Sequence, residues 1–104
     1  MDEYERLARF LDELPGGLPR SQSGVELRIL EKLFTPQEAS LACHLTLLPE
    51  EAGVIARRAG LPLTETRRLL DALDRKRLIL TFVEKGKPPR YMAQQFLVGF
   101  WETQ

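Results

Sequence analysis

The chain of 104 residues has one cysteine, one histidine, no formal net charge and no long apolar run. With Cys43 as its only thiol, it can form neither an internal disulfide nor a multi-cysteine metal site. A membrane-spanning helix needs about 20 consecutive apolar residues, so we expect no membrane contact. The first ten residues, MDEYERLARF, are charged throughout and lack the apolar core of a signal peptide. We therefore expect a cytoplasmic protein.

Two residue types that often perform catalysis, cysteine and histidine, occur only once each. Cys43 and His44 are neighbours in the sequence, and adjacent side chains on a helix point about 100° apart, so the two do not face a common reacting atom. The pair Gly16-Gly17 follows a helical pattern rather than the strand that precedes a phosphate-binding loop. We expect no catalytic residue, no metal ligand and no enzyme activity in this chain.

What the chain does have is a series of helix signals in a single domain, 1–104. Apolar residues at helical spacing predict a first helix over about 2–14. An S-x-x-E series at 23–26 has the form of a capping box and predicts the start of a second helix. The T-P-Q-E series at 35–38 predicts a third helix that runs to about residue 44, because threonine caps, proline suits the first helical position and glutamate closes the box.

The middle of the chain predicts two further helices joined by a short turn. Residues 45–48 are expected to be extended, and Pro49-Glu50-Glu51 is expected to open a helix with proline at its first position. Gly60 is a natural end for that helix. After Leu61-Pro62, a helix is expected to run to about Arg77, with Thr66 on the margin of its buried leucine stripe.

The remaining segments predict a hairpin and an apolar tail. The series LILTFVE, KGKPP and RYMA predicts two strands joined by a glycine-containing loop. The apolar segment 95–102 fits a helix or a strand, and we favour a helix. Together the elements predict a mainly α fold with a small β-hairpin, a winged helix-turn-helix. Its parts would be N-terminal helices in 2–44, the helix-turn-helix in about 49–77 and the wing in about 78–93.

One resemblance concerns the second helix of this helix-turn-helix and the wing. The runs LTETRRLLDAL and RKRLI, within residues 59–91, resemble the winged helix of MarR-type bacterial regulators. Position 77 is arginine where those regulators usually have glycine. The resemblance implies a DNA-binding transcription regulator, and such regulators commonly bind DNA as homodimers.

A second resemblance covers almost the whole chain. The stretches LPGGLP, SGVELRILEKLFTPQEASLACHLTLLPEEAGVIARRAG and KPPRYMAQQFLVGFWE are similar to the N-terminal region of ferredoxin-type iron–sulfur proteins of anaerobic bacteria and archaea. In those proteins a winged-helix module precedes a domain that binds four-iron–four-sulfur clusters. This resemblance implies that the chain is a fragment of a longer protein. The cluster cysteines are then expected only beyond Gln104.

Basic residues on the predicted recognition helix and wing indicate a possible DNA-binding face. Residues 51–104 hold ten basic and six acidic side chains, which permits a basic surface on a neutral chain. The candidates for base and phosphate contacts are Thr64, Arg67, Arg68, Lys85, Lys87 and Arg90. Glu65 and Asp71 oppose this interpretation, because each would meet phosphates, and Asp71 is placed to pair with Arg67 at i, i+4. A solvated or protein-docking face therefore stays open beside duplex DNA.

The aromatic residues Phe96, Phe100 and Trp101 raise a third possibility. At helical spacing they more often belong to a core, but if exposed they would mark a dimer contact or the docking site of a following domain. The sequence thus favours a non-enzymatic winged-helix module of an iron–sulfur protein. It would act as a DNA- or protein-binding adaptor for a downstream redox domain. A stand-alone MarR-like regulator is the alternative.

Overall fold

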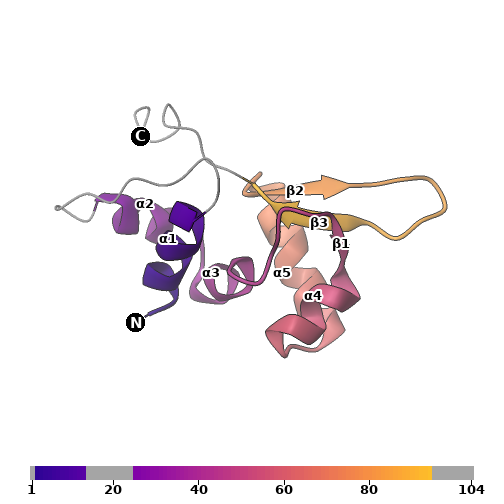
Figure 1. The fold of residues 1–104 in the computed structure, drawn as a ribbon, viewed down its shortest axis with the longest axis horizontal. Coiled ribbons are helices and arrows are strands. Elements are labelled where there is room, and N and C mark those ends of the chain that lie inside the picture. The colour runs from indigo at the N-terminus through magenta and orange to yellow at the C-terminus, as the bar shows by residue number, and fades with distance from the viewer. Residues whose placement is uncertain (1, 14–24, 95–104) are drawn as a thin grey trace. The chain divides into compact units, whose positions relative to one another are not determined.

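The computed structural model describes residues 2–13 and 25–94. The side chains are described for residues 2–13 and 27–94. This part of the chain is mainly helical, with a small antiparallel sheet, as the sequence predicts (Figure 1). Its contacts form two compact units, one within Met1–Cys43 and the other His44–Gln94. We describe each unit separately.

The first unit consists of three helices. They are α1 (Glu3–Glu13), α2 (Val25–Leu33) and α3 (Pro36–Ala42). α1 packs against both α2 and α3 and buries Leu7, Ala8 and Leu11, as its apolar spacing predicts. The Tyr4 hydroxyl donates a hydrogen bond to the backbone carbonyl of Phe34 at 2.9 Å, which fixes α1 to the segment between α2 and α3.

The capping box at the start of α3 is confirmed. The Thr35 hydroxyl accepts the Glu38 N–H at 3.2 Å, and the Glu38 carboxylate accepts the Thr35 N–H at 2.9 Å. The helix ends at Ala42, slightly earlier than expected. Ser23, the capping residue of the other predicted box, lies outside the described residues, and α2 begins at Val25.

The second unit contains three strands and two helices. In chain order they are β1 (Glu50–Glu51), α4 (Ala52–Ala59), α5 (Leu63–Arg75), β2 (Ile79–Phe82) and β3 (Arg90–Ala93). β3 is the central strand, with β2 and β1 antiparallel on its two sides. The predicted hairpin is confirmed, with Ile79 opposite Ala93 and Phe82 opposite Arg90.

The prediction that Pro49-Glu50-Glu51 opens a helix is wrong. Glu50 and Glu51 form β1 rather than the first turn of a helix, because the free edge of β3 offers them backbone partners, and α4 begins only at Ala52. Residues 45–48 are not a strand. This segment contacts the sheet through one hydrogen bond, from the Ala93 N–H to the Thr46 carbonyl at 2.8 Å.

The connection between α4 and α5 follows the sequence signals. Gly60 adopts the left-handed conformation (φ 72°), and its N–H donates to the carbonyl of Ala56. α5 ends at Arg75, two residues before the predicted end, because Arg77 turns into the left-handed region (φ 61°) and the Leu78 N–H closes the helix on the Leu73 carbonyl at 3.0 Å.

Packing of α4, α5 and the sheet creates the core of the second unit. Ile55, Leu70 and Leu73 are fully buried there. Thr66 is also fully buried, so its predicted place on the margin is wrong. It is tolerated inside because its hydroxyl donates to the Pro62 carbonyl at 3.0 Å, which satisfies the buried polar group. Within residues 2–13 and 25–94, no helix has the length and apolarity that a membrane crossing requires.

Candidate nucleic-acid interface

The residues proposed for DNA contact lie on α5 and on the β2–β3 hairpin of the second unit. Thr64, Arg67 and Arg68 are exposed on α5, and Lys85 and Lys87 are exposed in the hairpin loop. Figure 1 shows that loop extending beyond α4 and α5. Arg90 is half-buried at the start of β3.

Arg68 forms an ion pair with Glu65 on the surface of α5. Its Nε donates to the Glu65 carboxylate at 3.1 Å, and its Nη2 forms a second contact with the same group. The hydrogen bonds from Arg68 lower the pKa of Glu65, so the pair stays ionised at neutral pH. The positive field of Arg68 is therefore partly cancelled where a nucleic acid would approach.

Glu84 cancels part of the charge of the hairpin in the same way. Its carboxylate accepts a hydrogen bond from Arg90 Nη2 at 2.9 Å and lies 3.2 Å from Lys87 Nζ. Two cations therefore share one anion. Gly86, with φ 80°, makes the turn between Glu84 and Lys87, which brings this pair within reach of each other.

Arg67 and Lys85 remain available for an external anion. Both are exposed, and neither makes an ion pair within the described part of the chain. In particular, the i, i+4 pair between Arg67 and Asp71 that the spacing permits is not formed. The sequence identified both residues as candidates, but it could not show that they, rather than Arg68 or Lys87, are the unpaired cations.

A groove beside Arg67 was not foreseen from the sequence. It encloses about 310 Å³. Its lining residues are Glu51, Ala52, Gly53, Arg67, Asp71, Pro88, Pro89 and Tyr91. They come from the start of α4, from α5 and from the hairpin, and we refer to this feature as the α4–α5–hairpin groove. Segments far apart in the sequence meet here because β1 pairs with β3. No local sequence pattern predicts that pairing.

An ion pair holds β1 and α4 together at the edge of this groove. Arg58 Nη1 donates to the Glu50 carboxylate at 2.9 Å, Nη2 donates to its other oxygen, and Nη1 also contacts the His44 carbonyl. The Thr46 hydroxyl donates to Glu50 at 3.0 Å. The hydrogen bond from Arg58 is the main reason that the pKa of Glu50 is lowered. This bidentate pair links β1 to the last turn of α4.

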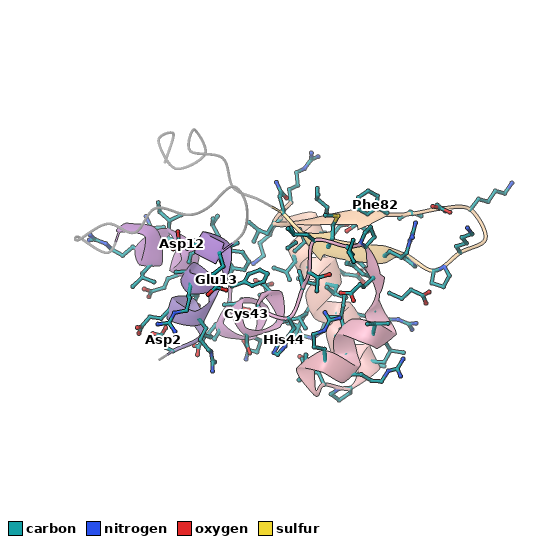
Figure 2. All side chains as sticks on the ribbon, viewed as in Figure 1. Asp2, Asp12, Glu13, Cys43, His44 and Phe82 are labelled. Carbon is teal, nitrogen blue, oxygen red and sulfur yellow. The ribbon has the colours of Figure 1, made fainter. Side chains whose placement is uncertain are left out.

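Cys43 and His44, the two residues weighed for catalysis, lie just beyond α3 (Figure 2). Cys43 is half-buried, and its thiol donates to the Ala39 carbonyl at 3.3 Å. Burial raises the pKa of this thiol against the opposing charge of Arg6, which favours the less reactive protonated form. The described residues contain no cluster of three or more side chains suited to a metal ion.

Phe96, Phe100 and Trp101, the proposed interface residues, lie outside the described residues. Comparison of the chain with known proteins identifies no relative. No protein-family model, no curated protein and no solved structure gives a significant match to the chain. We therefore base the functional proposal on the residues themselves.

Proposed function

We propose that residues 44–94 act as a winged helix-turn-helix that binds duplex DNA, with α5 as the recognition helix and the β2–β3 hairpin as the wing. The order of elements supports this proposal, since a strand, two helices joined by a tight turn and a hairpin follow one another. The observation that carries it is the pair of exposed, unpaired cations, Arg67 on α5 and Lys85 in the hairpin loop. The net charge of +4 over this unit, from ten basic and six acidic residues, agrees with it.

The ion pairs on this surface set the expected strength of binding. Each phosphate neutralised by a cation contributes a slope of about 0.9 to the fall of log K with log salt. Contacts from Arg67 and Lys85 alone predict a slope of about 2. If Arg68, Lys87 and Arg90 exchange their carboxylate partners for phosphates, the slope rises to about 4 to 5.

The test is fluorescence anisotropy of the whole chain with a mixed-sequence duplex over a salt series. We expect Arg67→Ala and Lys85→Ala each to lower the slope by about one unit. Glu84→Gln should strengthen binding, because it releases Lys87 and Arg90. The matched control is Arg75→Ala, which removes an exposed charge from the last residue of α5, away from the end that would enter the major groove.

Two results would overturn the DNA-binding proposal. One is no binding at low salt, which would instead favour a protein partner for the same surface. The other is an equal loss of slope in Arg67→Ala, Lys85→Ala and Arg75→Ala, which would indicate only a response to net charge.

The resemblance to ferredoxin-type iron–sulfur proteins leads us to propose a wider role. In it, the domain is a non-enzymatic adaptor for a downstream redox domain that would bind the four-iron–four-sulfur clusters. The alternative is a stand-alone MarR-like regulator, which would act as a homodimer. The native reading frame distinguishes them: cysteine clusters after Gln104 would support the adaptor, whereas a stop codon there would support the regulator. Light scattering of the purified chain tests for the homodimer.

A further inference from the structure

The α4–α5–hairpin groove has the size and shape of a site for a small molecule. Its volume of about 310 Å³ lies at the lower end of the range for ligand pockets. Three walls meet around it: the first turn of α4, the exposed face of α5, and the end of the hairpin loop with the start of β3. All of them belong to the second unit, so the groove does not depend on how the two units are arranged.

Tyr91 is a buried tyrosine in the wall of this groove. Its side chain is only 5% exposed, and its hydroxyl has no hydrogen-bond partner among the described residues. Buried tyrosine hydroxyls usually have a partner. Burial raises the pKa of this hydroxyl, and the charges of Asp71 and Asp74 raise it further against the opposing effect of Arg67. The hydroxyl is therefore protonated at neutral pH.

Gly53 leaves the opposite wall open. It lies in the first turn of α4, where glycine is less favourable than alanine. A Cβ atom at this position would meet no atom within 4 Å, so no contact within the described chain requires a glycine there. The N-cap residue, Glu51, makes no side-chain cap. The first N–H groups of α4 therefore lack a capping acceptor and are available to an anionic group that approaches Gly53 closely.

The charges around the groove are of both signs, which defines the kind of ligand. Arg67 and the N-terminus of α4 attract an anion, whereas Glu51 and Asp71 attract a cation. A simple anion such as phosphate would meet two carboxylates, and a simple amine would meet the guanidinium. A molecule that carries both charges satisfies both sets of groups.

We propose that the groove binds a small zwitterion of the α-amino-acid class. Its carboxylate would accept hydrogen bonds from the first turn of α4 and from Arg67, and its ammonium group would contact Asp71. The Tyr91 hydroxyl would complete the polar contacts, and residues 88–89 would provide an apolar surface for the side chain. This site does not depend on DNA binding. If α5 does bind DNA, the shared use of Arg67 would make the two ligands compete.

The test is thermal unfolding of the whole chain with each standard α-amino acid as the probe, followed by calorimetric titration of those that stabilise it. We expect at least one amino acid to bind, and its des-amino carboxylic acid to bind at least tenfold more weakly. Tyr91→Phe should weaken binding about tenfold, the effect of one lost hydrogen bond. Asp71→Asn should remove the preference for the amino acid over the des-amino acid.

Gly53→Leu adds a bulky side chain at a residue that lines the groove and is expected to keep the fold. The added side chain enters open space and favours the helix, so the free protein should be at least as stable while amino-acid binding is lost. Arg75→Ala, outside the groove, is the control and should bind normally. No binding by any standard amino acid, unchanged binding by Gly53→Leu, or equal affinity for the des-amino acid would each overturn the proposal.

Discussion

Replacing Arg77 with glycine is expected to stabilise the protein. Arg77 is the only residue other than glycine with a positive φ (61°) in the described part of the chain. It follows α5 at the position where helices commonly end in glycine. Its side chain is exposed and makes no ion pair within the described residues, so the substitution removes a backbone strain and no contact.

The size of the effect follows from two opposing terms. A left-handed conformation costs an L-residue roughly 1–2 kcal/mol, whereas the greater freedom of glycine in the unfolded chain costs about 0.4–1 kcal/mol. Arg77→Gly should therefore raise the free energy of unfolding by about 0.5–1 kcal/mol, with a rise in melting temperature of about 4 °C. The hydrogen bonds from Arg77 N–H to the Asp74 carbonyl (2.9 Å) and from Leu78 N–H to the Leu73 carbonyl should remain.

Urea denaturation followed by circular dichroism measures this change, and two variants control it. Arg77→Ala removes the charge but keeps the Cβ atom, so its stability should stay within about 0.5 kcal/mol of the parent. Arg75→Gly places the same residue inside the helix and should lower stability by about 0.5–1 kcal/mol. If Arg77→Ala stabilised the chain as much as Arg77→Gly, relief of charge rather than of backbone strain would be the cause, and the reasoning would be refuted.

Three further substitutions test other contacts by the same urea assay. Thr35→Ala removes the hydroxyl that caps α3 and should cost about 1 kcal/mol; an unchanged midpoint would mean that the box contributes nothing. Thr66→Val should change stability by less than about 1.5 kcal/mol, because the Pro62 carbonyl keeps its bond from the Thr66 N–H at 3.0 Å; a larger loss would show that the hydroxyl bond matters more. Since Arg58 lowers the folded-state pKa of Glu50, the stability from this pair is fully present above the unfolded-state pKa and is lost as pH falls through the folded-state pKa. Glu50→Gln should remove that part of the pH dependence, and an unaltered pH profile would contradict it.

Contacts between near neighbours in the sequence were predicted well. The capping box at 35–38 and the turn at Gly60 involve residues within one helical turn, so their chemistry can be recognised from spacing alone. The same holds for the hairpin, whose strands are joined by a short loop. Thr66 shows the limit of periodicity: spacing placed it at the edge of the leucine stripe, but packing of the sheet and α4 around α5 buried it completely.

The sequence placed the candidate DNA-contact residues on one helix and the hairpin, but it did not predict which of them form ion pairs. Arg67 and Arg68 are equivalent in the sequence, yet only Arg68 is bound by Glu65. Whether a salt bridge forms depends on the direction of the two side chains, which the sequence alone does not predict. Likewise Lys85 and Lys87 are separated only by Gly86. The turn at Gly86 lets Lys87 form an ion pair with Glu84, whereas Lys85 forms none within the described residues.

By itself the sequence determined that helices form in these regions, the cap of α3, the turn between α4 and α5, and the hairpin, because each depends on backbone preferences and apolar spacing within a short stretch. Tertiary structure alone decided that Glu50 and Glu51 form a strand, since a two-residue strand exists only where a partner such as β3 offers hydrogen bonds. It also decided the groove in which Gly53, Arg67 and Tyr91 meet. Those residues come from three separate elements, and only the pairing of β1 with β3 brings the three walls together.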